Sequence, residues 1–330
     1  MSCESFYIPP SKNCWMNKLA ISRGGRIDLE DVEFYCGQGT LDIVSTSNRI
    51  NVVLLTSYSP GGYFYCTVTV KKKQPSPSGC SCGYKNSMRI VGGSETGVNE
   101  YPMMVGLVSL NSYELFCGGT IISHFYILTA AHCLMQKTPK NVAILVGDHD
   151  ISVGSDTDSA KLYIAMSFSI HPNYNTGNQK NDIALIRVKE KIEFNMKVGP
   201  ACLPFKNSNN SFAGEVVYAV GWGSTSFGGK TSDKLLHVAL NVITTKQCTP
   251  VYGSLVSDKQ MCTYKDNKDA CQSDSGSPLL WMDPDSGSLN VLGIVSYGIQ
   301  CATSNPSVNT RVSSYLGWIT GVTNEAYCIK

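Results

Sequence analysis

The sequence has little charge and no long apolar run. Charged residues make up 16% of the 330 residues and the formal net charge is +2, which argues against a basic surface for nucleic acid. No stretch approaches the ~20 consecutive apolar residues that a membrane-spanning helix needs. The N-terminal residues also lack the basic and apolar segments of a secretion signal. We therefore expect neither a nucleic-acid partner nor a membrane span.

The sequence also lacks the clusters that are typical of zinc sites. No Cys-x-x-Cys pair stands beside another, and the five histidines form no cluster, so we expect no metal of this kind. The chain does have 14 cysteines, an even number spread over its whole length. Such a set indicates a disulfide framework formed in an oxidising compartment. We expect a secreted, extracellular protein and, because a secretion signal is missing, a natural start other than Met1.

The composition changes at residues 71–89, which open on three lysines and hold two prolines without apolar periodicity. This is typical of a linker. Before and after it, short runs of alternating apolar residues are bounded by Gly, Asn and Ser, which predicts strands. Only residues 312–322 show clear helical spacing. We predict an all-β protein with one domain at 1–70, a linker or activation segment at 71–89 and a second domain at 90–330.

A polar stretch, DACQSDSGSP at residues 269–278, lies directly before an apolar run. Its residues are turn formers, so a surface loop is the simplest interpretation. Ser275 could instead be a nucleophile if a base lay within hydrogen-bond reach. His132, in the motif TAAHC, is the candidate base, and Asp182, before the apolar run IALI, is the candidate acid. Each motif alone is weak, because a lone histidine usually has a structural role.

Together the motifs TAAHC, NDIALI and CQSDSGSP, with GWG at 221–223 and SYG at 296–298, form a specific set. Their order resembles that of the trypsin- and chymotrypsin-like serine proteases, and the resemblance extends from residue 90 to about residue 318. It implies a double six-stranded β-barrel with a C-terminal helix and a catalytic site between the barrels. We therefore expect an endopeptidase that acts on protein substrates and needs no cofactor.

The resemblance implies a role for each site residue. Ser275 would attack the peptide carbonyl, His132 would transfer the proton and Asp182 would orient the imidazole. The backbone N–H groups of Ser273 and Ser275 would hold the oxyanion. The family usually has glycine at the positions of Ser273 and Ser277, and serine lacks the freedom of glycine in φ. A mis-set donor would lower the rate by about 10²–10³.

Activation and specificity are also implied by the resemblance. Cleavage after Arg89 by an upstream protease would free the ammonium of Ile90 to pair with Asp274, so the uncut chain would be a zymogen. Asp269 would lie at the floor of the specificity pocket and select Arg, with Lys weaker, because Ala270 offers no hydroxyl to a lysine ammonium. The remaining substrate-binding residues would be Ser296, Gly298 and Ser307, of which Ser307 would narrow the pocket.

Residues 14–70 resemble the later part of a CUB domain, in the motifs CW at 14–15, YCG at 35–37 and GYFYC at 62–66. This implies a small, truncated β-sandwich. The two resemblances imply the disulfides Cys36–Cys66, Cys117–Cys133, Cys248–Cys262 and Cys271–Cys301, a pairing of Cys14 with Cys3, and a tether from Cys202 to Cys80 or Cys82, with the remaining one paired with Cys328.

Two further motifs concern the surface of the protein. Asp148, Asp150, Asp156 and Asp158 lie in one loop and could bind calcium, but no bidentate Glu closes the set, so we favour a solvated loop. Asn209 opens the N-glycosylation sequon Asn-Asn-Ser, which predicts an exposed loop.

The sequence thus predicts a secreted protease with an activating protease and protein inhibitors among its partners, in a setting such as venom or haemolymph. The alternative is a protease homologue with weak or no catalysis that acts as a binding or regulatory factor through its CUB-like part. Ser273 keeps this alternative open, whereas the complete set of His132, Asp182 and Ser275 favours the enzyme.

Overall fold

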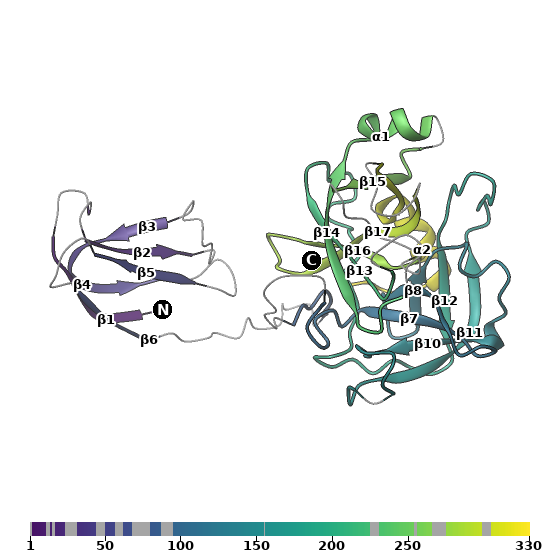
Figure 1. The fold of residues 1–330 in the computed structure, drawn as a ribbon, viewed down its shortest axis with the longest axis horizontal. Helices are drawn as coiled ribbons and strands as arrows, with labels where there is room; N and C mark the ends of the chain where they lie inside the picture. Colours follow the sequence, from purple (N-terminus) through teal and green to yellow (C-terminus); the bar gives the residue numbers. More distant parts are fainter. Residues whose placement is uncertain are drawn as a thin grey trace. The chain divides into compact units, whose positions relative to one another are not determined.

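The computed structural model divides the chain into two compact units, residues 1–77 and 78–330 (Figure 1). It describes residues 2–10, 14, 17–23, 32–43, 50–56, 62–67, 80–86, 95–154, 156–224, 231–253, 256–265, 275–298 and 305–330. The longest helices of the described residues have eight residues each, and none of them could span a membrane.

The first unit is a small β-sandwich. Its two antiparallel, three-stranded sheets have the orders β4-β1-β6 and β3-β2-β5. Apolar side chains of both sheets share one core, formed by Phe6, Ile8, Leu19, Ile21 and Ile43. The strands are β1 (Ser2–Ile8), β2 (Lys18–Ser22), β3 (Val32–Tyr35), β4 (Gly37–Asp42), β5 (Asn51–Leu55) and β6 (Tyr63–Thr67).

The disulfides of this unit differ from the expected ones. The structure joins Cys3 to Cys66 and Cys14 to Cys36, so the expected pairs Cys36–Cys66 and Cys3–Cys14 are wrong. The reason lies in the sheet, because β1 pairs with β6 and places Cys3 directly opposite Cys66, with their Cα atoms 3.8 Å apart. Cys36, which follows β3, is left for Cys14, at a Cα–Cα distance of 5.5 Å.

The second unit contains two closed, six-stranded antiparallel barrels, as predicted. The first barrel has the order β10-β11-β12-β9-β8-β7 and the second the order β13-β14-β15-β18-β17-β16. The strands of the first are β7 (Met104–Ser109), β8 (Leu115–Ile121), β9 (Tyr126–Thr129), β10 (Val142–Val146), β11 (Lys161–Ile170) and β12 (Ala184–Val188). Those of the second are β13 (Val216–Gly221), β14 (Leu236–Ile243), β15 (Gln260–Tyr264), β16 (Pro278–Met282), β17 (Leu289–Gly298) and β18 (Ser307–Arg311).

Helices are few in this unit. The predicted C-terminal helix is present as a 3-10 turn, η4 (Val312–Tyr315), that continues into α2 (Leu316–Thr323), and its apolar face packs into the core. A second helix, α1 (Thr245–Tyr252), was not predicted. It begins at a capping box in which the Thr244 side chain accepts from the Gln247 N–H and the Gln247 side chain accepts from the Thr244 N–H. A further 3-10 turn, η2 (Pro139–Asn141), precedes β10.

The segment 80–86 belongs to the second unit, although its composition is that of a linker. Disulfides join Cys80 to Cys328 and Cys82 to Cys202. Gly83 adopts a φ of +72°, and a Cβ there would lie 2.6 Å from a backbone oxygen of β17, so only glycine fits this close approach. The sequence left open which cysteine meets Cys202, and the structure assigns Cys82.

Candidate active site

The imidazole of His132 is held by the carboxylate of Asp182. His132 follows β9 and Asp182 precedes β12, and these two strands pair in the first barrel. His132 Nδ1 lies 2.7 Å from Asp182 Oδ2, and the His132 backbone N–H donates to Asp182 Oδ1 at 2.9 Å. Asp182 is fully buried, whereas a quarter of the His132 side chain is exposed. The carboxylate thereby fixes the orientation of the ring through Nδ1. Nε2, at the other edge, contacts the disulfide sulfur of Cys133 at 3.7 Å, and sulfur is a weak acceptor.

Two residues of the second barrel complete the setting of Asp182. The Ser296 hydroxyl on β17 donates to Asp182 Oδ2 at 2.5 Å, and the Thr310 hydroxyl on β18 donates to the Asp182 backbone oxygen at 2.7 Å. The side chain of Ser296 is thus a positioning group for Asp182, and the expected binding of substrate at Ser296 stays a prediction for its backbone. Thr310 was missed, because nothing in the sequence signals a contact between β18 and residue 182.

Ser275 lies in a tight turn that leads into β16. Its backbone oxygen accepts the Gly118 N–H from β8 at 2.8 Å, which ties the turn of one barrel to a strand of the other. Gly276 N–H donates to the Val295 oxygen at 2.9 Å. Among the residues that the structure describes, no hydrogen bond joins the Ser275 hydroxyl to His132. Such a bond is often loose in free enzymes and tightens when substrate binds.

The turn requires glycine at position 276. Gly276 has a φ of +80°, and a Cβ there would lie 2.3 Å from Thr129 Oγ1 and 2.6 Å from the Gly118 oxygen. The Gly276→Ala variant is therefore expected to displace Ser275 and to lower kcat/KM at least about 10²-fold on an ester substrate. Gly287 is the matched control, since it has a φ of +62° but no neighbour within 4 Å of a Cβ. If both alanine variants lost activity equally, the close approach at Gly276 would not be the cause.

Ser277, at a position where the family resemblance led us to expect glycine, is completely buried. Its hydroxyl has no hydrogen-bond partner among the described residues, which costs about 1–3 kcal/mol. The hydroxyl fills the space beside Gly118, where a Cβ would lie 2.0 Å from it. The serine is thus accommodated because its neighbour on β8 is glycine.

The other expected site residues fall into two groups. Gly298 and Ser307 are direct partners across β17 and β18, and Ser307 is buried, so the two expected pocket walls adjoin. The remaining calls, Arg89, Ile90, Asp269, Ala270, Ser273, Asp274 and the pair Cys271–Cys301, lie outside the described residues. The structure also contains the disulfides Cys117–Cys133 and Cys248–Cys262.

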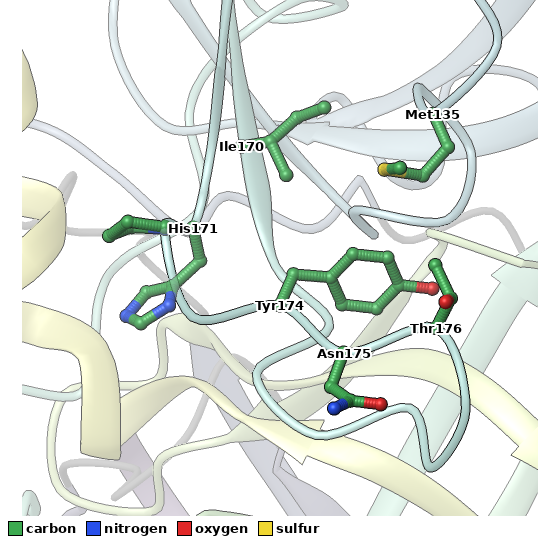
Figure 2. Close-up of a pocket in the computed structure, with 7 residues that line it drawn as sticks. Met135, Ile170, His171, Tyr174, Asn175 and Thr176 are labelled. Atoms are coloured by element: carbon green, nitrogen blue, oxygen red, sulfur yellow. The ribbon is translucent and has the colours of Figure 1, made fainter.

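A hollow of about 510 Å³ lies between the segments that carry the histidine and the aspartate. Figure 2 shows its lining, which is made by Met135, Ile170, His171, Pro172, Tyr174, Asn175 and Thr176. The Tyr174 hydroxyl donates to Gln179 Oε1 at 2.8 Å, and burial together with the charge of Asp182 raises the pKa of Tyr174 to about 12. Tyr174 therefore stays protonated beside the catalytic carboxylate. No sequence pattern predicted this hollow, because Met135 and the residues of its other wall are far apart along the chain.

A metal site is not supported at the active site. In the described part of the chain, the one cluster of three ligand-type side chains is Cys117, His132 and Cys133. The two cysteines are joined in a disulfide, so neither can offer a thiolate to a metal.

The acidic loop after β10 is only partly solvated. Asp148 Oδ1 and Asp156 Oδ1 are buried without a hydrogen-bond partner among the described residues. Asp150 instead accepts bonds from a neighbouring serine, and Asp158 forms an ion pair with Lys197. Asp156 Oδ2 accepts the Asp150 backbone N–H at 2.7 Å, so one oxygen each of Asp148 and Asp156 is left, fewer than the six to eight that calcium takes. The side chains alone therefore do not make a calcium site.

The buried carboxylate of Asp148 predicts a pH-dependent stability. Burial, with the charge of Asp156, raises its pKa from 3.8 to about 6. Since the folded protein then holds this proton more tightly than the unfolded chain, the free energy of unfolding should fall as pH rises from about 4 to about 6. Thermal melts in a chelator should show Asp148→Asn more stable than the wild type at pH 7 and close to it at pH 4.

Asp150→Asn is the control for this prediction. The Ser152 hydroxyl lowers the pKa of Asp150, so the ionised group is stabilised in the folded protein at neutral pH and the benefit is lost on acidification. Asp150→Asn should therefore be less stable than the wild type at pH 7. A Tm difference for Asp148→Asn that stayed constant from pH 4 to pH 7 would contradict the role of Asp148.

Comparison with known proteins agrees with this geometry. The family model for trypsin matches residues 90–319. The chain is 41% identical to venom serine protease 34 of Apis mellifera, covering 100% of this chain and 80% of that protein. It is 42% identical to a venom serine protease of Polistes dominula, with 76% and 91% covered, and 32% identical to the clotting factor G beta subunit of Tachypleus tridentatus, with 73% and 82% covered. This chain belongs to the trypsin family of serine proteases.

Proposed function

We propose that the protein is a secreted serine endopeptidase that is made as a zymogen, activated by cleavage after Arg89, and cuts protein substrates after Arg. The observation that carries the proposal is the buried Asp182 carboxylate bonded to His132. The Ser275 turn of the second barrel is in addition tied to β8, a strand of the barrel that carries His132 and Asp182. Relatives named as venom proteases and a clotting factor subunit support an extracellular setting.

The catalytic cycle follows from these contacts. Substrate binding brings the Ser275 hydroxyl to His132 Nε2, which takes its proton as the oxygen attacks the peptide carbonyl. The Nδ1–H bond to Asp182 stabilises the imidazolium that forms, and the proton then passes to the leaving amine. Water repeats the sequence and releases the acyl group. Asp182 accepts from His132 twice and from Ser296, and these contacts hold the imidazole in place during the cycle.

Specificity for arginine rests on Asp269 and on the walls of its pocket. A buried carboxylate without a partner is costly, so it selects a cationic side chain, and a guanidinium reaches it with two donors. Ser307 is buried in β18 directly beside Gly298, which supports a narrowed pocket. A substrate lysine would bind less well than an arginine, because its ammonium is a compact point charge and Ala270 has no hydroxyl that could solvate it.

A peptide library tests the specificity on protein that has been cut after Arg89. We expect cleavage after Arg, weaker cleavage after Lys, and faster turnover of arginine substrates in Ser307→Gly, because the glycine opens the channel. A preference for aromatic or small aliphatic residues before the scissile bond would show that Asp269 does not set specificity. Unchanged turnover in Ser307→Gly would refute the claim that Ser307 narrows the pocket, but it would leave the preference for arginine standing.

The second candidate function is a protease homologue that acts through its first unit. That unit exposes aromatic side chains on β6, with Tyr65 78% and Tyr63 59% exposed, and such residues often contact partners. Its resemblance to a CUB domain supports a binding role only by analogy. A protein cut after Arg89 that failed to hydrolyse any arginine ester would favour this alternative.

A further inference from the structure

A polar turn on the second barrel presents Asn209 to solvent. Phe205 on one side packs against Tyr327, and Phe212 on the other is buried against Trp281. The residues between these anchors form an exposed turn closed by the Asn210 N–H, which donates to the Asn207 oxygen at 3.0 Å. The apolar anchors point inward, so Asn209 is left outside.

This asparagine is the one N-glycosylation acceptor that the sequence contains. The sequon Asn209-Asn-Ser211 has the required hydroxyl two residues on, and Asn305-Pro-Ser is excluded by its proline. An exposed turn is also what such a modification needs, since the attached sugar is bulky and hydrophilic.

A hollow of about 690 Å³ lies at the foot of this turn. Hydroxyl and amide side chains make up most of its lining, together with one cation, one carboxylate and one apolar side chain. Besides Ser208–Ser211, its lining is made by Thr245, Asp258, Arg311, Ser313, Ser314 and Leu316. A sugar ring offers hydroxyl groups on its rim and C–H groups on its faces, so this mixture suits it better than it suits an apolar or a strongly charged ligand.

Arg311 holds the hollow together and keeps donors free. Its Nε–H is shared by the oxygens of Asp258 and Gln260, at 3.1 and 3.3 Å, and its Nη1 donates to the Ser211 oxygen at 3.2 Å. Nη2 donates to no residue within the described ranges. The guanidinium, which has five N–H donors, thus fixes the backbone of the sequon and still presents hydrogens to a ligand.

We propose that Asn209 carries an N-linked glycan whose first, N-acetylated sugar packs into this hollow against Arg311 and Ser314. The glycan comes from an oligosaccharide linked to a lipid pyrophosphate. The bond between C1 of the first sugar and the phosphate oxygen breaks, C1 bonds to Asn209 Nδ2, and the amide proton leaves with the pyrophosphate. The seated sugar then links the turn to β18 and η4.

The modification is tested by peptide mapping of the full chain secreted from insect cells. We expect a glycan on Asn209, its removal by peptide-N-glycosidase with conversion of Asn209 to Asp, and its loss in Asn209→Gln and in Ser211→Ala. Asn210→Gln is the matched control and should keep the glycan, because it leaves the sequon intact. Unmodified Asn209 in the secreted protein would overturn the proposal.

The seat is tested by thermal melts of three forms: the full glycan, a single sugar left by an endoglycosidase, and Asn209→Gln. The first two should melt together and the third about 2–4 °C lower, the shift expected for about one hydrogen bond in a unit of this size. Ser314→Ala should lower the Tm when it is made in the glycosylated protein. The same substitution made in the Asn209→Gln variant, which carries no sugar, should leave the Tm of that variant unchanged. Equal Tm values for all three forms would overturn the seat.

Discussion

Replacing Asp182 with asparagine is expected to lower kcat about 10⁴-fold while the protein still folds. The backbone N–H of His132 donates to Asp182 Oδ1 at 2.9 Å. Because this donor needs an acceptor, the carbonyl oxygen of the new amide must take the position of Oδ1. Its NH₂ group then faces His132 Nδ1, 2.7 Å away in the wild type. An imidazole that accepts at Nδ1 carries its proton on Nε2, and it can no longer take the proton of Ser275.

Ser296→Ala is the control for the Asp182 prediction. It removes the hydroxyl that donates to Asp182 Oδ2 but leaves the carboxylate able to accept from His132. We expect a much smaller loss in kcat than for Asp182→Asn. Melting curves show whether each variant is folded. A kcat for Asp182→Asn near that of the wild type would mean that the aspartate does not set the tautomer of His132.

The second large effect is expected for Arg89→Gln. This variant cannot be cut after residue 89, so it should stay inactive after the treatment that activates the wild type. Without a new terminus at Ile90 the oxyanion donors would not be ordered, and the loss of one such donor alone costs about 10²–10³ in rate. The measurement compares ester hydrolysis by the variant and the wild type after treatment with an arginine-specific protease. An untreated Arg89→Gln protein as active as the cut wild type would refute zymogen control.

The cut protein is expected to stay in one piece. Two disulfides, Cys80–Cys328 and Cys82–Cys202, fix the upstream segment to the second unit, and Lys85 adds a salt bridge to Glu100 at 3.0 Å. Cut wild type should give one band on non-reducing gels and two after reduction. A Cys82→Ser, Cys202→Ser double variant should still give one band without reductant, because Cys80–Cys328 remains. Two bands from that variant would argue against the disulfide between Cys80 and Cys328.

The motifs predicted the barrels and the candidate catalytic residues through the family that they resemble, whereas contacts between distant strands could not be read from the sequence. His132, Asp182 and Ser275 each lie in a short motif, and alternating apolar residues indicated the strands. Ser296 and Thr310 reach Asp182 only because the barrels close and meet, and no spacing reports that.

The first unit shows the same limit. The pairing of Cys3 with Cys66 depends on β1 lying beside β6, which follows from the sheet order and not from the spacing of cysteines. Helix α1 is a different case, because a signal was present. Thr244 followed three residues later by Gln247 is the pattern of a capping box.

Labelling of the cut protein with a serine-directed phosphonate tests directly whether Ser275 is an activated nucleophile. The reagent requires a nucleophilic serine beside a working base, so it does not depend on knowing the natural substrate. We predict stoichiometric labelling with the adduct on the peptide that contains Ser275, together with loss of ester hydrolysis and no labelling of Ser275→Ala. A cut, folded wild type that took up no label, or that was labelled on another residue, would contradict the assignment of this site as a serine protease active site.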